Sequence, residues 1–271
     1  MNFYLGTHRP TWLGRTSVPL FVSRRTMPQG DVGRRALGRW ALDSGGFTEL
    51  NMHGEWVTKP ETYVAEVRRW SSEVGGLDWA AVQDWMCEPV VLARTGLTIA
   101  EHQRRSVESW RRLTDLAPEL PWAPVLQGWT ADDYLRCADA YQAAGADWPR
   151  VPVVGVGTMC RRQATTAAVL ILGRVARDVA DRGAVGVHAF GFKAQGLRAA
   201  GRLGVALASA DSLAWSYRAR RSPPLDGCEG HKNCANCLRY ALEWRTELLA
   251  KIALDTAPVA RHTPAHNPPE A

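Results

Sequence analysis

Short apolar runs alternate along the chain with longer amphipathic segments. The runs cover residues 2–5, 19–22, 40–42, 79–83, 124–127, 151–156, 184–190 and 204–209. Several are rich in valine, and turn or charged residues bound most of them, which is typical of buried parallel strands. Residues 9–38 carry the least regular part of this pattern.

Start signals mark helices between the later runs. Thr58 and Glu61 stand three residues apart, as in a capping box, and Pro60 falls in the first turn that follows. Thr98 and Thr130 introduce two further segments in a similar way. The pattern predicts helices over residues 61–74, 98–116, 130–145, 164–182, 194–202 and 234–254.

Eight strands with intervening helices predict an α/β fold, a (β/α)8 TIM-like barrel. A doubly wound open sheet is the alternative, but no glycine-rich phosphate-binding motif follows a predicted strand. We expect one barrel domain over residues 1–254. It includes a small zinc-binding segment at 228–237 after the last strand, and a disordered proline-rich tail follows over 255–271.

Composition excludes several classes of protein. The 271 residues are 46% hydrophobic and 22% charged, which suits an ordered globular chain. No stretch reaches 18 apolar residues, and the first residues lack the pattern of a signal peptide, so a cytoplasmic location is expected. The formal net charge of +6 permits a polyanionic partner without requiring one.

The cysteines fall into two groups. Three are isolated and are expected to be ordinary buried thiols: Cys87, Cys137 and Cys160. The others form a cluster with one histidine inside ten residues: Cys228, His231, Cys234 and Cys237. Four such ligands suit a closed, tetrahedral, structural Zn²⁺ site. A redox pair at the last two cysteines is the competing interpretation.

Three aspartates, Asp43, Asp84 and Asp211, follow or end three different predicted strands. In a barrel these strand ends meet at one mouth, so the three carboxylates are expected to converge there. Each alone could be a helix N-cap. Together with Gln127 they suit chemistry at a glycosidic carbon, where one carboxylate attacks and another moves a proton. A third carboxylate and an amide can read a nucleobase edge.

These residues also carry a family resemblance. Asp-Ser-Gly-Gly-Phe at 43–47 resembles the signature of tRNA-guanine transglycosylases. Asp84 with Cys-Glu-Pro, Val-Leu-Gln-Gly at 125–128, Val-Gly-Val-Gly at 154–157, Asp211 before an arginine-rich stretch and the Cys/His cluster follow in the family's order. The short chain, the spacing of the cluster and the opening residues look more like the branch that inserts 7-deazaguanines into DNA.

The resemblance implies a base exchange in DNA. Asp211 would attack C1′ of a guanosine and form a covalent intermediate, and Asp43 would act as general acid and base at N9. A free 7-deazaguanine such as 7-cyano-7-deazaguanine would replace the guanine, with a separate ATPase as a further partner. The implied substrate-binding residues are Ser44, Gly45, Phe47, Asp84, Gln127, Gly128 and Gly157.

Because a base inside a duplex must leave the stack, side chains near the mouth could offset the cost by stacking. The candidates are Phe47, Trp85, Trp129 and Arg218, with plain packing as the alternative. His188 is expected to be a core or supporting histidine. Three other functions stay open: a tRNA-guanine transglycosylase acting on a tRNA loop, a non-catalytic zinc-containing nucleic-acid-binding protein, and a free nucleoside glycosidase.

Overall fold

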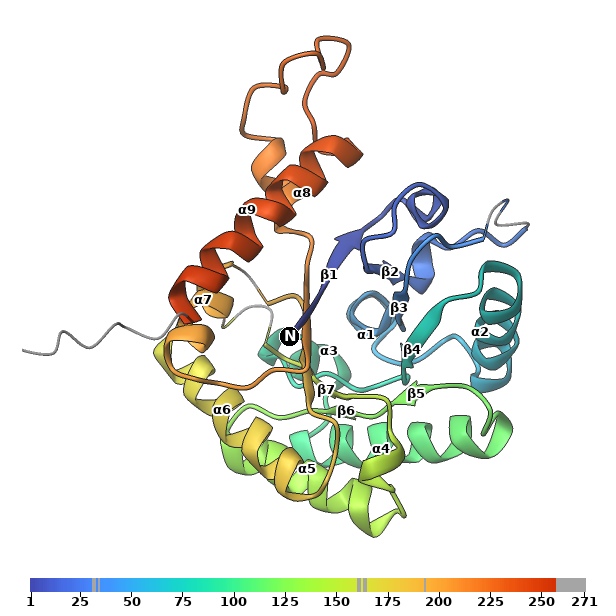
Figure 1. Ribbon diagram of the computed structural model, residues 1–271. Coiled ribbons are helices and arrows are strands. Elements are labelled where there is room, and N and C mark those ends of the chain that lie inside the picture. The colour runs from blue at the N-terminus through green and yellow to red at the C-terminus, as the bar shows by residue number, and fades with distance from the viewer. Residues whose placement is uncertain (31–32, 34, 160–161, 163–164, 193, 257–271) are drawn as a thin grey trace, which may run out of the picture.

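The computed structural model describes residues 1–30, 33, 35–159, 162, 165–192 and 194–256 (Figure 1). Its strands all pair in parallel, in the spatial order β5-β4-β3-β2-β1-β9-β8-β7-β6. They are β1 (Asn2–Thr7), β2 (Leu20–Ser23), β3 (Trp40–Asp43), β4 (Leu77–Ala81), β5 (Trp122–Ala123), β6 (Val125–Leu126), β7 (Val154–Val156), β8 (Val187–Ala189) and β9 (Ser209–Ser212).

Pro124 explains why nine strands make an eight-fold barrel. Proline has no N–H to donate, so it divides one extended stretch into β5 and β6. β5 pairs with β4 on one side, β6 pairs with β7 on the other, and the Pro124 carbonyl accepts the Gly155 N–H. The ring therefore nearly closes through this stretch. The predicted TIM-like barrel is confirmed, and the open doubly wound sheet is wrong.

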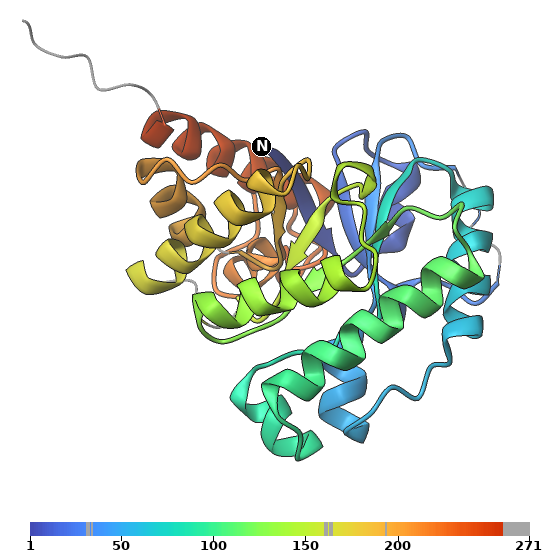
Figure 2. The ribbon, with the colours of Figure 1, turned by 90° about the horizontal axis from the view of Figure 1, so that it is seen from below.

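Helices surround the strands, as the two views in Figures 1 and 2 show. They are α1 (Gly46–His53), α2 (Pro60–Val74), α3 (Pro89–Thr95), α4 (Ile99–Leu116), α5 (Ala131–Ala143), α6 (Thr166–Asp181), α7 (Ala194–Arg202), α8 (Ala214–Ala219) and α9 (Leu238–Thr256). The larger buried side chains that fill the core between them and the barrel include Trp40, Trp70 and Trp215. Within the described residues, no helix is long and apolar enough to cross a membrane.

Several predicted boundaries need correction. The last strand covers Ser209–Ser212 rather than 204–209. The last helix begins at Leu238 rather than at residue 234, because the preceding residues form the turns of the Cys/His segment. That helix continues to Thr256, while the rest of the predicted tail, 257–271, lies outside the described residues. The short helices α1, α3 and α8 were not predicted.

The helix start signals differ in outcome. Thr130 forms a complete capping box with Asp133, and the Thr98 hydroxyl accepts the Glu101 N–H at 3.2 Å. The predicted capping box at Thr58 is wrong, because its hydroxyl instead donates to a carboxylate on α1. α2 therefore begins after Lys59 without a side-chain cap.

Candidate active site

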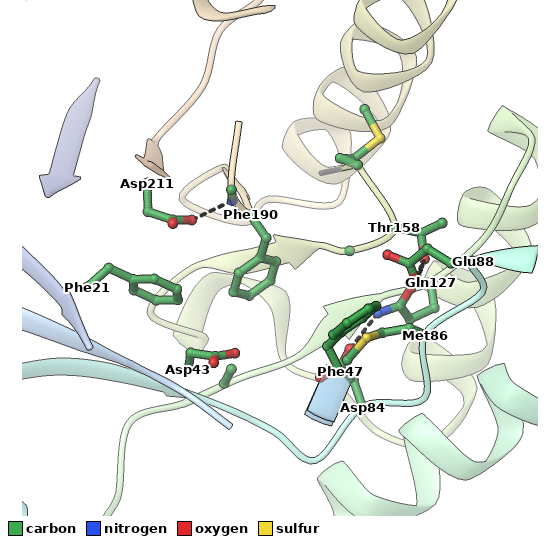
Figure 3. Close-up of a pocket in the computed structure, with 14 residues that line it drawn as sticks. Phe21, Asp43, Phe47, Asp84, Met86, Glu88, Gln127, Thr158, Phe190 and Asp211 are labelled. Carbon is green, nitrogen blue, oxygen red and sulfur yellow. Dashed lines mark hydrogen bonds between the residues drawn. The ribbon is translucent and has the colours of Figure 1, made fainter. Parts of the chain in front are cut away.

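A cavity of about 230 Å³ lies at the carboxyl ends of the barrel strands (Figure 3). Pockets for drug-sized ligands measure about 300–1,000 Å³, so this one suits a single small ring system. Its lining combines carboxylates, an amide and apolar rings: Phe21, Asp43, Phe47, Ala81, Asp84, Met86, Glu88, Gln127, Gly157, Thr158, Met159, Phe190, Gly191 and Asp211.

The polar groups of the cavity form two sets. Figure 3 shows Asp43 and Asp211 at one end, and Asp84 with Gln127 and Thr158 at the other. The aspartates do not cap the helices that follow them. Those helices start instead from the N-caps Gly45, Glu88 and Leu213.

Asp211 is held in place from the wall of the barrel. Its Oδ1 accepts the Gly191 N–H at 2.7 Å and lies 3.2 Å from Nε2 of His188. The other ring nitrogen of His188 lies 2.8 Å from the Ser209 hydroxyl. His188 is fully buried, and its ring packs among four aromatic rings, with Trp79 and Phe190 nearest. These contacts fix the orientation of the Asp211 carboxyl.

Asp43 ends β3 next to Asp211. Burial raises the pKa of the Asp43 carboxyl, and the charge of Asp211 adds to that effect. Hydrogen bonds from the Ser23 side chain and the Gly45 N–H work in the opposite direction. A carboxyl with a raised pKa keeps its proton more readily and can deliver it, so Asp43 suits a general acid and base.

Asp84 is the centre of the second set. The Gln127 amide donates to its Oδ2, and the Ser44 hydroxyl lies 3.5 Å from its Oδ1. Burial raises the pKa of Asp84 to about 7, with the neighbouring carboxylates of Asp43 and Glu88 adding and the Gln127 amide opposing. The side-chain carbonyl of Gln127 (Oε1) in turn accepts a hydrogen bond from the Thr158 hydroxyl at 2.6 Å.

The backbone around Gly157 makes this network possible. A Cβ at Gly157 would lie 2.2 Å from Nε2 of Gln127, so only glycine leaves room for the amide. Thr158 adopts a φ of 56°, which is strained for a β-branched residue. Its hydroxyl oxygen accepts the Cys87 N–H at 3.0 Å, which ties the loop after β7 to the loop after β4.

The Cys/His segment follows the barrel between α8 and α9. One ligand atom from each of four residues, Cys228, His231, Cys234 and Cys237, lies within 4.8 Å of the others. Tight turns join these residues in two pairs: the N–H of His231 donates to the Cys228 carbonyl, and that of Cys237 donates to the Cys234 carbonyl. Three thiols and an imidazole at this spacing could hold a metal ion.

The family model of DpdA, DeoxyPurine in DNA protein A, matches residues 1–265. The chain belongs to this family. It is the 7-deazapurine DNA-modification transglycosylase family related to tRNA-guanine transglycosylase, so the resemblance drawn from the sequence is confirmed. Membership makes the protein a transglycosylase with DNA as its substrate. A search of curated proteins finds no match.

Solved structures resemble the barrel of this DpdA-family protein. A mandelate oxidase variant is 16% identical with a TM-score of 0.50, and the match covers 94% of this chain and 74% of that one. Another, with a monooxide FMN adduct, is 14% identical with a TM-score of 0.47 over the same shares. At 16% identity the first of these matches shows the fold alone.

The DpdA-family cavity includes most but not all of the residues expected from the sequence. Asp43, Phe47, Asp84, Gln127, Gly157 and Asp211 line it. Ser44, Gly45 and Gly128 are not among its lining residues. Ser44 supports Asp84, Gly45 precedes α1 with a φ of 81°, and Gly128 packs against the start of α5, where a Cβ would lie 2.6 Å from that of Asp133.

Other sequence expectations have a structural outcome. Trp85 and Trp129 are not in the cavity lining, and each packs under an arginine, Arg105 and Arg162 respectively. Cys87 and Cys137 are buried thiols as expected, and Cys160 lies outside the described residues.

Sequence reasoning missed Thr158, Phe190 and the lining role of Glu88. Glu88 had a signal, because it belongs to the Cys-Glu-Pro motif, whereas Thr158 had none.

Proposed function

We propose that this protein replaces guanine in DNA with a free 7-deazaguanine, such as 7-cyano-7-deazaguanine, through a covalent aspartyl intermediate. One observation carries the proposal. Asp211 and Asp43 lie together at one end of the cavity, and a donor–acceptor network fills the other end (Figure 3). A nucleotide can therefore place C1′ between the two carboxyls while the far edge of its base meets the network.

In the first half-reaction, Asp211 attacks C1′ and the bond from C1′ to N9 of guanine breaks. Both hydrogen bonds that the described residues make to Asp211 fall on Oδ1. We assign Oδ2 as the attacking atom for that reason. Asp43 delivers its proton to N9 of the leaving guanine, which departs neutral and leaves Asp43 as a carboxylate.

In the second half-reaction, the same steps occur in reverse with the incoming base. The Asp43 carboxylate removes the proton from N9 of the 7-deazaguanine, and N9 attacks C1′ as the ester bond to Asp211 breaks. Two displacements at the same carbon retain its configuration. Because the covalent intermediate keeps the sugar attached to the enzyme, the strand position is occupied until the new base arrives.

Asp84 and Gln127 are assigned to the base edge. The N1–H and exocyclic amine that guanine and 7-deazaguanines share are donors, and Asp84 accepts them in its ionised form, which such donors favour. Gln127 holds that carboxylate by donating to Oδ2, and Thr158 fixes the Gln127 amide by donating to its carbonyl. Gly157 leaves room for the amide, as described above.

We assign the metal as a structural Zn²⁺ held by Cys228, His231, Cys234 and Cys237. The donor set of three thiolates and an imidazole fits tetrahedral zinc, and protein atoms would fill all four positions. The ion would stabilise the fold of the segment between α8 and α9. A separate ATPase is proposed as a partner on the resemblance alone.

The test is incorporation of labelled 7-cyano-7-deazaguanine into DNA and into tRNA, measured side by side. Asp211→Asn preserves the size of the nucleophile and should abolish incorporation. Asp132→Asn, an exposed aspartate on α5, is the matched control and should retain it. The wild type treated with denaturant during turnover should also yield a protein–DNA adduct that the Asp211→Asn variant does not form.

Each outcome has a clear meaning. Incorporation into tRNA alone would refute DNA as the substrate and would leave the proposed base-exchange mechanism standing. Incorporation that survives Asp211→Asn would overturn the nucleophile. DNA binding without exchange of any 7-deazaguanine, with or without an added ATPase, would favour the non-catalytic binding protein.

A further inference from the structure

The surface beside the nucleophile carries an unusual set of exposed side chains. Leu213, two residues after Asp211, is 43% exposed, and Tyr217, one helical turn further along α8, is 62% exposed. Arg221 continues the same line, with its guanidinium 3.6 Å from the centre of the Tyr217 ring. We call Leu213, Tyr217 and Arg221 the α8 stripe.

The opposite face of α8 is anchored both to the barrel and to the Cys/His segment. Trp215 is fully buried, and its indole N–H donates to the Gly6 carbonyl in β1 at 2.8 Å. The Ser216 hydroxyl donates to the Ala235 carbonyl, inside the Cys/His segment, at 3.0 Å. An anchored helix presents its outer side chains in a fixed position, which applies to Tyr217 within α8 and to Leu213 at its N-cap. Arg221 lies in the turn after α8, where its N–H donates to the Arg218 carbonyl at 3.0 Å.

The chemistry of the proposed substrate gives this feature a use. The cavity holds one small ring system, so the neighbouring nucleotides of the strand must stay outside, on the rim. Extruding a base from a duplex leaves a gap in the stack and costs a few kcal/mol. Proteins that open duplexes fill such gaps with apolar or aromatic side chains and pair the backbone with cations.

We propose that the α8 stripe is the wedge that opens duplex DNA for this enzyme. Tyr217 stacks in the gap left by the extruded guanine, Leu213 packs between the gap and the cavity mouth, and Arg221 faces the phosphates of the flanking strand. Arg220, which directly follows α8, is exposed and adds positive charge there, whereas Arg218 on α8 forms an ion pair with Glu247 at 3.1 Å. This inference rests on the proposed function and adds how a paired guanine reaches the cavity.

The test compares exchange at a paired guanine with exchange at the same guanine placed in a mismatch or a single strand. Tyr217→Ala should lower exchange at the paired guanine by about 5- to 150-fold, the range expected for one lost stacking contact. Exchange at the unpaired guanine should fall by less than about 3-fold, because that base needs little energy to leave the stack. Tyr217→Phe keeps the ring and should restore the wild-type ratio.

Val185→Ala is the control for an exposed apolar residue. Val185 precedes β8, at the end of the barrel opposite the mouth, and its side chain is also exposed. In the Val185→Ala variant, the ratio of exchange at the paired guanine to exchange at the unpaired guanine should equal that of the wild type. Equal losses at both guanines in Tyr217→Ala, or no loss at either, would overturn the wedge.

A second measurement separates the wedge from the proposed function. A duplex with 2-aminopurine beside the target guanine reports unstacking by fluorescence, and Asp211→Asn prevents any exchange. Binding of this variant should raise the fluorescence, and adding Tyr217→Ala should remove the rise while anisotropy shows retained binding. If the fluorescence rises but the wild type exchanges no base, the proposed base exchange is refuted and the wedge stands. An unchanged fluorescence with full binding would refute the wedge.

Discussion

Gly157→Ala most directly tests the network of Asp84, Gln127 and Thr158 that we propose reads the base. The added Cβ would lie 2.2 Å from Nε2, 2.7 Å from Cδ and 2.9 Å from Oε1 of Gln127, all well inside van der Waals contact. Gln127 is fully buried, so its amide can escape only by breaking its bonds to Asp84 and Thr158. Overpacking of this kind costs about 1–3 kcal/mol.

The expected effects on stability and on activity differ in size. A loss of about 2 kcal/mol corresponds to a fall in Tm of about 4–8 °C for a domain somewhat smaller than this one. The exchange rate should fall further, roughly 100-fold, because a displaced amide and carboxylate no longer meet the base. Thermal unfolding followed by circular dichroism gives the first quantity, and labelled-base incorporation gives the second. Gly30→Ala is the control, since a Cβ there would meet nothing within 4 Å.

A double-mutant cycle decides whether the clash is the cause. Gln127→Ala removes the atoms that the new Cβ would strike, so Gly157→Ala should cost almost no further stability in that background. The coupling free energy should therefore be about 2 kcal/mol. Additive losses in the double variant, or a Gly157→Ala protein with the Tm and exchange rate of the wild type, would refute the packing argument.

Three further predictions concern ionisation, positioning and the metal. Because the pKa of Asp84 rises from 3.8 to about 7, the folded state retains a proton that the unfolded chain loses, so the contribution of Asp84 to stability falls as pH rises from about 4 to 7. Asp84→Asn should flatten that slope in Tm. His188→Gln should lower kcat roughly 10- to 100-fold with KM for the free base unchanged. The proposed zinc site predicts about one zinc per chain by mass spectrometry in the wild type, and Cys237→Ser should abolish that zinc and lower Tm.

The barrel was predictable because its strands are buried on both faces. Such strands appear in the sequence as compact apolar runs, and charged or turn residues separate them. The break at Pro124 was not predicted, since it depends on which neighbour each half of the stretch pairs with. The late start of α9 had a similar cause, because the turns of the Cys/His segment override the helical pattern there.

The carboxylates of the cavity were predictable for a geometric reason. Parallel strands in a barrel all end at one mouth, so residues at strand ends must converge whatever their spacing in the sequence. The role of Thr158 was not predictable in that way. Its hydroxyl reaches Gln127 and the Cys87 N–H only because the backbone adopts a positive φ, which a β-branched residue does not signal. Ser44 and Gly128 follow strands too, but local packing turns them away from the cavity.

The position of the Cys/His segment argues that a metal held there would serve the rim of the candidate active site and not the chemistry. The segment bonds to α8 through the Ala235 carbonyl, and the side chain of Asn236 is hydrogen-bonded to His8 at the end of β1. His8 in turn stacks on Trp215, the residue that anchors α8 to the barrel. The segment thus holds the helix that follows Asp211, while its four candidate ligands lie outside the cavity lining. A metal held there would fix where DNA meets the enzyme, and it would leave bond-breaking to the aspartates proposed for that role.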